Sequence, residues 1–231
     1  MSAMTHKIAE VARFEPIEDV RPSDHAWPQM VWPVPAGTEL VGEAVRLTPV
    51  DPAADAHDLF HALDRADVWA HVPGRPADPA DLEKILGARC AQPEWQPWTV
   101  RTRHAVGDVP AGAVVGMTSF LDVATYDGRL EIGYTLYAPA VWATAVNPET
   151  KLLLLGYAFD TLGVGRVQLK TDTRNHRSQQ AIYRLGAQYE GTLRRHFRRP
   201  DGTVRDTVMF SVTAEDWPMV RERLARRLGN D

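Results

Sequence analysis

The stretch from Glu131 to Gly186 constrains the fold more than any other part of the chain. Its apolar residues recur with alternating strand and helix periods. The pattern predicts a strand, a helix, a second strand and a second helix, over residues 129–137, 148–162, 166–171 and 175–185. A tight loop joins the first strand to the first helix, where Asn147 suits the N-cap and Pro148 the first helical position. Because free N–H groups and the helix dipole attract anions there, the stretch predicts an anion site beside a cleft.

Regular patterns also flank this stretch. We expect strands over residues 43–49, 98–103 and 113–123, helices over 53–64 and 81–91, and a terminal helix over 217–228. Two further strands, 188–195 and 204–212, pair as a hairpin around the turn Pro200-Asp201-Gly202. Antiparallel strands followed by helical crossovers predict an α/β (α+β) fold with a mixed, mostly antiparallel sheet flanked by helices. The expected organisation is an arm over 1–39, one domain over 40–214, and a C-terminal helix over 215–231.

The predicted arm contains five prolines and several large apolar residues. The prolines disfavour regular structure, whereas Trp27, Met30, Val31 and Trp32 are costly to leave in water. One interpretation is that the arm docks these side chains on its own domain. The other is that it covers a partner subunit, as in a homodimer, or helps to line the substrate site.

Composition excludes several classes of protein. The 231 residues are 44% hydrophobic and carry a net charge of −4, which is unlike a binder of bulk nucleic acid or anionic membrane. The longest apolar run, around residues 152–155, is too short to span a bilayer, and residues 1–13 lack the core of a secretory signal. A single cysteine permits no internal disulfide, so a cytoplasmic location is expected. The eight histidines show no zinc-ligand spacing, so no metal is expected.

Two short motifs resemble the GNAT superfamily of N-acetyltransferases, and most closely its RimJ/RimL-like branch. One is Asn175-His176-Arg177-Ser178 followed by Leu185-Gly186-Ala187, which is similar to the family's N-x-x-S…L-G-F/A signature. The other is the loop that in the family reads Q/R-x-x-G-x-G/A and holds the pyrophosphate of coenzyme A. Its six positions here are Trp142, Ala143, Thr144, Ala145, Val146 and Asn147. Trp142 stands in place of Gln/Arg, Ala145 in place of the central glycine and Asn147 in place of the last small residue. Compared with glycine, the methyl groups of Ala143 and Ala145 narrow the backbone conformations that the loop can adopt and the approach of a ligand.

The resemblance implies an enzyme that transfers the acetyl group of acetyl-CoA directly to a primary amine, either a protein N-terminus or a small amine. Leu136 and Tyr137 would offer the strand edge that pairs with pantetheine, and a backbone N–H near Tyr137 would stabilise the developing oxyanion. Asn175 would bind the pantetheine region, Ser178 would donate a proton to the departing thiolate, and Glu131 would accept the proton of the amine. Tyr183 is out of register with the family's catalytic tyrosine, whose position is Ile182.

Other interpretations remain open at the level of sequence. Asn175 could serve only as a helix cap, and Glu131 could be a solvated strand residue beside Arg129. The alanines of the loop and the missing tyrosine would also suit a non-catalytic acyl-CoA-binding or regulatory protein. A basic cluster on the hairpin is either a solvated face or a patch for an acidic protein, RNA or the 3′-phosphate of CoA; it comprises Arg194, Arg195, Arg198, Arg199 and Arg205.

Overall fold

An eight-stranded sheet forms the centre of the molecule. The computed structural model describes residues 15–20, 27, 29–199 and 201–229. The strand order is β1-β2-β3-β4-β5-β6-β8-β7, and among these pairs β5–β6 is parallel while the others are antiparallel. The strands are β1 (Leu40–Val41), β2 (Val45–Pro49), β3 (Gln96–Thr102), β4 (Val114–Ala124), β5 (Arg129–Tyr137), β6 (Arg166–Asp172), β7 (Gln188–Arg198) and β8 (Val204–Thr213). This confirms the predicted mixed, mostly antiparallel sheet flanked by helices.

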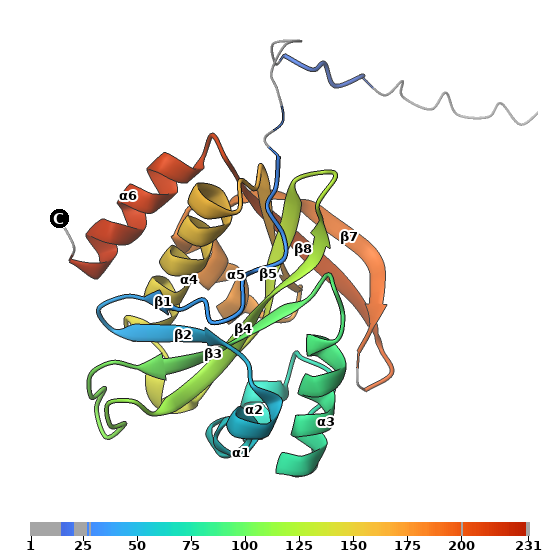
Figure 1. Cartoon of the computed structure of the whole chain (residues 1–231). Coiled ribbons are helices and arrows are strands. Elements are labelled where there is room, and N and C mark those ends of the chain that lie inside the picture. The colour runs from blue at the N-terminus through green and yellow to red at the C-terminus, as the bar shows by residue number, and fades with distance from the viewer. Residues whose placement is uncertain (1–14, 21–26, 28, 200, 230–231) are drawn as a thin grey trace, which may run out of the picture.

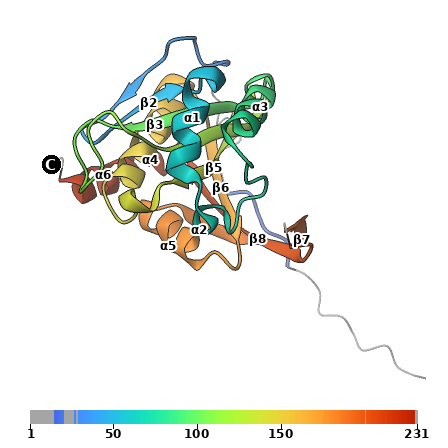
Figure 2. The ribbon, with the colours of Figure 1, turned by 90° about the horizontal axis from the view of Figure 1, so that it is seen from below.

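Helices cover both faces of the sheet (Figure 1). One group contacts β3, β4 and β5 and consists of α1 (Pro52–Leu63), α2 (Ala66–Trp69) and α3 (Pro79–Cys90). The other group packs on the opposite face and consists of α4 (Val146–Gly156), α5 (His176–Leu185) and α6 (Trp217–Leu228). A π-helical turn, Tyr157–Thr161, continues α4. Figures 1 and 2 show the β7–β8 hairpin at the opposite side of the molecule from α6.

Each face of the sheet has its own hydrophobic cluster. On the α4–α6 face, Trp98 and Phe120 pack with Leu154 and Trp217. On the α1–α3 face, α1 and α3 bury Leu59 and Leu86 against Met117 and Leu136 of the sheet. Because the strands are covered on both sides, their buried residues run almost continuously along β4.

Helix α4 begins two residues earlier than its sequence predicts. Ala145 occupies the N-cap position and Asn147 lies inside the first turn, so the assignment of Asn147 as the cap is wrong. Two interactions fix the earlier start: the Val146 N–H donates to Thr144 Oγ1 at 3.3 Å, and the Glu149 N–H donates to the Ala145 carbonyl at 2.9 Å. Pro148 is tolerated there because the first N–H groups of a helix have no partner within the helix.

The chain segment before β1 contacts the domain at several points. The Trp32 indole N–H donates to the Pro93 carbonyl at 2.7 Å, and the Val31 N–H donates to the Leu162 carbonyl at 2.8 Å. Met30 and Trp32 pack against the cluster on the α4–α6 face. The other part of the predicted arm, residues 1–14, 21–26 and 28, lies outside the described residues, as does Pro200 of the hairpin turn. The division into arm, domain and terminal helix therefore stays a prediction.

Short elements were the ones that periodicity did not predict. Helix α2 has four residues and strand β1 has two, so each contains only about one period of its pattern, too few for a repeat to be recognised. Helix α2 matters for function because it contacts β5 and leads into His71, next to the opening described below.

Candidate active site

The parallel strands β5 and β6 pair over only part of their length and then separate. Their register runs from Arg129↔Arg166 to Glu131↔Gln168, although β5 continues to Tyr137 and β6 to Asp172. A cleft of about 860 Å³ opens where the pairing ends. Its walls are the separated ends of β5 and β6, the loop before α4, the start of α5, the segment 67–73 and the tip of the β7–β8 hairpin. The split thus exposes a strand edge inside a cleft.

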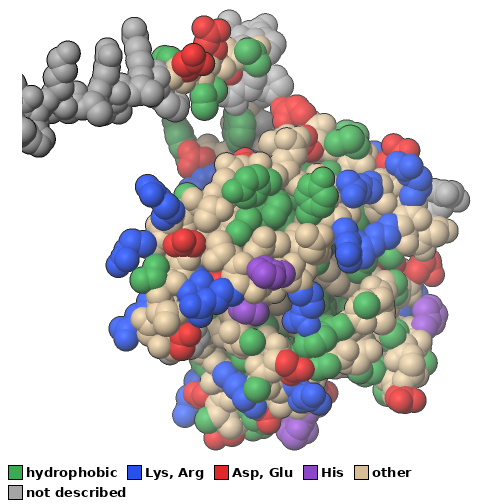
Figure 3. All heavy atoms as spheres, turned by 180° about the vertical axis from the view of Figure 1, so that it is seen from behind, with side chains coloured by type: hydrophobic (Ala, Val, Ile, Leu, Met, Phe, Trp, Pro, Cys, Tyr) green, Lys and Arg blue, Asp and Glu red, His purple; other side chains and the backbone are tan. Residues whose placement is uncertain are grey.

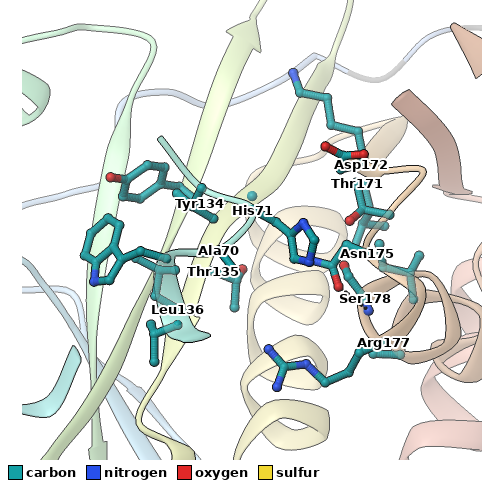
Figure 4. Close-up of a pocket in the computed structure, with 18 of the residues that line it drawn as sticks. Ala70, His71, Tyr134, Thr135, Leu136, Thr171, Asp172, Asn175, Arg177 and Ser178 are labelled. Atoms are coloured by element: carbon teal, nitrogen blue, oxygen red, sulfur yellow. Dashed lines mark hydrogen bonds between the residues drawn. The ribbon is translucent and has the colours of Figure 1, made fainter. Parts of the chain in front are cut away.

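A β-bulge shapes the β5 wall of this cleft. Ser119 pairs with Gly133 and Met117 with Leu136, so one residue of β4 faces two residues of β5. Tyr134, one of those two, takes a positive φ of 48°. The Arg89 guanidinium lies 3.6 Å from the centre of the Tyr134 ring and holds it from the α3 side. The bulge turns Tyr134 and Thr135 toward the cleft, where Figure 4 shows both side chains.

The loop before α4 is fastened to the end of β5. The Trp142 indole N–H donates to the Tyr137 carbonyl at 3.0 Å. Ala143 adopts a left-handed φ of 61°, whereas Ala145 has an ordinary φ of −65°. Among the predicted cofactor residues of the loop, Trp142, Ala143 and Asn147 line the cleft. Thr144, Ala145 and Val146 are not among the lining residues, because Thr144 bonds the Val141 carbonyl and Val146 is buried in the core.

The first turn of α5 faces this loop across the cleft. Asn175 caps the helix, since its side-chain oxygen accepts the Ser178 N–H at 3.0 Å. Figure 4 shows Asn175 and Ser178 together, with Arg177 on one side of them and Asp172 on the other. The Arg177 guanidinium lies 3.7 Å from the centre of the Trp142 ring. The structure therefore brings both sequence motifs to one cleft, with a cation between them.

The other residues considered in the sequence analysis either line the cleft or lie outside it. Leu136, Tyr137, Asn175 and Ser178 all line the cleft, and so does the buried Ile182. Tyr183 is 60% exposed and does not line the cleft, as expected for a side chain pointing away from Ile182.

Glu131 is a buried residue at the point where the strands separate. Its Oε2 lies 2.6 Å from Lys170 Nζ and accepts from Gln168 Nε2 at 3.2 Å. Burial raises the pKa of Glu131, and the Lys170 ammonium partly opposes that shift. Its carboxylate also lies over Gly133, where an added Cβ would meet Oε1 at 2.5 Å. The interpretation of Glu131 as a solvated residue beside Arg129 is therefore wrong, because Glu131 is 3% exposed and Arg129 pairs with Asp127.

Lys151 of α4 is a buried amine that the sequence did not single out. Its Nζ donates to Thr135 Oγ1 at 2.9 Å, in the bulge of β5, and lies 3.5 Å from Thr118 Oγ1. Burial lowers the pKa of Lys151 to about 7, and the charge of Glu131 only partly opposes this. The side chain lines the cleft, so an amine that titrates near pH 7 lies under its β5 wall.

Asp172 and His71 are two further titratable residues of the cleft that sequence reasoning missed. Burial alone would raise the pKa of Asp172, but hydrogen bonds from Arg199 Nε and Nη2, at 2.6 and 2.7 Å, and from the Arg174 N–H lower it to about 2. His71 extends from the segment after α2 toward Asn175 (Figure 4). Burial lowers the pKa of His71, helped by neighbouring arginines, although Asp172 opposes the shift, so its imidazole is neutral at pH 7. No sequence signal marks either residue, since both reach the cleft through tertiary packing.

The surface charge, the helix lengths and the positions of possible metal ligands can be compared with what nucleic-acid binders, membrane proteins and metal proteins require. On the face shown in Figure 3, basic and acidic side chains are interspersed, with hydrophobic side chains between them. Within the described part of the chain, no helix has the length and apolar character needed to cross a bilayer. Residues 15–20, 27, 29–199 and 201–229 also contain no group of three or more His, Cys, Asp or Glu side chains that could hold a metal ion.

Known proteins share this fold. Solved structures include one named a probable acetyltransferase (GNAT family) from Chromobacterium violaceum, which is 29% identical, with a TM-score of 0.78 over 89% of this chain and 100% of that one. A RimJ from Mycobacterium smegmatis, in complex with CoA-disulfide, is 20% identical with a TM-score of 0.68 over 89% of this chain and 98% of that one, a likeness of fold alone. The same holds for a spermidine N-acetyltransferase from Vibrio cholerae, in complex with CoA and spermine, which is 12% identical with a TM-score of 0.64 over 77% of this chain and 99% of that one.

Sequence comparison gives the family directly. An uncharacterized N-acetyltransferase of Bacillus subtilis, YoaA, is 30% identical over 99 residues, which is 43% of this chain and 55% of that protein. The chain spans about half the length of the curated relatives it matches. Residues 44–188, more than half of the chain, match the family described as the acetyltransferase (GNAT) domain. The chain belongs to the GNAT family of acetyltransferases.

Proposed function

We propose that this protein is an N-acetyltransferase that moves the acetyl group of acetyl-CoA directly to a primary amine. The observation that carries the proposal is the split between β5 and β6, which opens a cleft exactly between the two family motifs at Trp142–Asn147 and Asn175–Ser178. Membership of the RimJ/RimL-like branch, a cytoplasmic location and a homodimer remain predictions beside it.

The lining of the cleft suits coenzyme A. Arg177 stacks on Trp142 and has no carboxylate within 4.0 Å among the described residues, so its charge is available for a phosphate. Trp142, Ala143 and Asn147 border the same end. The unpaired edge of β5, up to Leu136 and Tyr137, extends from there into the cleft and would accept the amide groups of pantetheine.

Acetyl-CoA would supply an activated acyl group, whose bond to sulfur breaks as the bond to the acceptor nitrogen forms. Ser178 lines the cleft and its hydroxyl makes no hydrogen bond with another described residue, so it is free to donate a proton to the departing sulfur. A backbone N–H of β5 near Tyr137 would stabilise charge on the carbonyl oxygen. Asn175 would position Ser178 through the cap and bind the cofactor from the same end.

The acceptor amine must lose a proton, and two groups of the cleft qualify as its base. Glu131 has a pKa raised by burial, which favours proton acceptance, but its carboxylate also holds Lys170. His71 is neutral at pH 7 because its pKa is lowered, and it points at Asn175 from the opposite wall (Figure 4). Glu131→Gln and His71→Gln discriminate between them: the variant that removes the base abolishes the acidic limb of the pH profile of kcat/KM, and the other retains it.

Titration calorimetry with acetyl-CoA is the first test, with ADP as a fragment control and desulfo-CoA as an unreactive analogue. We expect micromolar affinity for acetyl-CoA and release of free thiol with at least one amine of a broad panel. Binding without turnover would favour a non-catalytic acyl-CoA-binding protein. Absence of binding would contradict the proposal outright.

Matched arginines on α5 test the placement of the phosphates. Arg177→Gln removes the free cation at the Trp142 end, whereas Arg184→Gln removes an exposed arginine of the same helix that does not line the cleft. The Arg177 variant should bind acetyl-CoA about tenfold more weakly, since hydrogen bonds to charged groups contribute about 1.5–3 kcal/mol. Equal affinities of the two variants would place the phosphates elsewhere.

A further inference from the structure

Positively charged side chains outnumber negatively charged ones in the lining of the cleft, and most of them are arginines. Seven lysine and arginine side chains line it, against four carboxylates. Three of these seven cations pair with carboxylates of the cleft itself. Arg199 pairs with Asp172 and Lys170 pairs with Glu131, both at 2.6 Å. Arg174 pairs with Asp201 at 3.4 Å.

Arg205 of β8 is different, because no carboxylate partner faces it. Its Nε donates to Thr207 Oγ1 at 3.1 Å, and its guanidinium lies 5.2 Å from the centre of the Phe197 ring. Among the described residues no carboxylate oxygen lies within 4.0 Å of Arg205. The side chain is half-buried, and burial lowers the pKa of Arg205 even though Asp172 and Glu131 oppose the shift. A partly desolvated guanidinium that no carboxylate contacts directly is costly, and a ligand anion bound to it would offset that cost.

The other lining arginines without a carboxylate do not resemble it. Arg177 stacks on Trp142 at the loop end, where the coenzyme phosphates are proposed to lie. Arg198 is exposed, so water screens its charge. Arg194 and Arg195 of the predicted basic cluster do not line the cleft. The cluster therefore contributes to the cleft one half-buried cation that has no carboxylate in direct contact, rather than a continuous patch.

Register places Arg205 at the end of the cleft that is opposite Arg177. Thr207 pairs with Asp172, the last residue of β6, and Arg205 lies two residues further along β8 on the same side. Asp172 is the group whose charge acts most strongly on Arg205. Figure 4 shows Asp172 and Arg177 on opposite sides of Asn175 and Ser178. A ligand group at Arg205 would thus approach the reaction centre from the side away from the loop.

We infer that Arg205 binds a carboxylate of the acceptor, so that this transferase selects primary amines that also carry an acidic group and disfavours polyamines. This inference rests on the proposed function and adds the substrate class to it. A guanidinium suits the choice because its planar fork matches a carboxylate with two parallel hydrogen bonds. The phosphates of CoA are the other source of an anion, and the experiment separates the two.

The test uses amines of equal length that differ in the charge of the far end. A series of ω-amino acids is compared with the corresponding primary amides and the corresponding diamines, with thiol release measured at saturating acetyl-CoA. At the best chain length, we expect kcat/KM for the acid to exceed that for the amide by about tenfold or more, and the diamine to be poorest. Equal values, or a preference for the diamine, would overturn the inference.

Three variants assign the preference to Arg205. Arg205→Gln should abolish the preference for the acid, chiefly through KM for the acceptor, while KM for acetyl-CoA stays unchanged. Arg205→Lys should keep part of the preference, because it retains the charge without the fork. Arg194→Gln, on the same hairpin but outside the cleft, should behave as wild type. Thermal unfolding of each variant shows that it is folded. A preference retained in Arg205→Gln, or a loss of acetyl-CoA affinity in its place, would contradict the inference.

Binding measurements distinguish a failure of this inference from a failure of the proposed function. The N-acetylated acids and amides are titrated calorimetrically into the protein with and without CoA. Tighter binding of the acids that disappears in Arg205→Gln supports the anion site even if no amine is acetylated, in which case only the proposed function fails. Turnover of amines without any effect of the carboxylate leaves the proposed function standing and rejects the inference.

Discussion

At the scale of single residues, the cleft contains one residue with a strained backbone and one buried amine, and each of these lowers the stability of the fold when taken alone. Ala143 takes the left-handed backbone region, and Lys151 buries an amine with two hydroxyl neighbours. Such costs persist only where surrounding structure imposes them, and they concentrate at functional sites. Both residues border the cleft.

Ala143→Gly should stabilise the protein by about 0.5–1 kcal/mol, because glycine adopts a φ of 61° without the contact between Cβ and the carbonyl oxygen. The same change removes a methyl group from the cleft lining and should tighten acetyl-CoA binding. Urea unfolding measures the first effect and calorimetry the second. Ala138→Gly, at an ordinary φ of −55°, is the control and should lower stability. A loss of stability in Ala143→Gly as large as in the control would contradict the expected strain.

Lys151→Met should change how stability depends on pH. The pKa of Lys151 is about 7 in the folded protein and about 10.5 for an ordinary lysine in the unfolded chain, so between these pH values the unfolded chain holds a proton that the folded protein lacks. Folding stability therefore rises with pH across that window through this residue, by at most about 1.4 kcal/mol per pH unit, and the penalty is complete below pH 7. The methionine variant should be the more stable protein at pH 6–7, and its advantage should shrink toward pH 10. Urea unfolding at several pH values checks this, and a constant difference would exclude it.

At the scale of elements, the active-site loop depends on how α4 is anchored. Glu149 in its first turn is 3% exposed and accepts the N–H groups of Glu43, Ala44 and Val45 at 2.9, 2.6 and 2.7 Å. The helix start, and with it the loop before the helix, is thereby fixed to the turn between β1 and β2.

Glu149→Gln should destabilise the protein by about 3 kcal/mol. An amide offers one acceptor oxygen and turns an NH2 group toward backbone donors, so buried N–H groups lose their partners. Glu43→Gln changes an exposed carboxyl of the same turn and should have little effect. Denaturant unfolding compares the two variants, and similar stabilities would show that the anchor contributes little.

At the scale of the whole molecule, residues before β1 join distant parts of the chain. Trp32 reaches the connection between α3 and β3 at Pro93, and Val31 bonds to Leu162 at the end of the π-helical turn. These contacts lie on the chain's own domain, which the docking interpretation of the predicted arm anticipates.

Trp32→Ala should therefore lower the free energy of unfolding by about 2–3 kcal/mol, from lost apolar burial and the lost hydrogen bond to Pro93. Trp32→Phe keeps a ring without the N–H and should cost about 1 kcal/mol. Differential scanning calorimetry measures both. Wild-type stability in Trp32→Ala would mean that this segment is held by something other than the domain.

The sequence by itself determined the long elements and the mixed sheet, because these depend on periodicity and on local turn and cap chemistry, whereas the two motifs of the cleft came from the resemblance to the GNAT family. Asn175 caps α5 as its sequence position predicts, and β5 and α6 have the predicted bounds. Only the tertiary structure decided which charged and titratable side chains lie close together and how deeply they are buried. Glu149 ties the first turn of α4 to the turn before β2, and α2 and the hairpin bring His71 and Arg205 to the cleft. Burial lowers the pKa of Lys151 and raises that of Glu131. Such effects depend on neighbours remote in sequence, which no local pattern records.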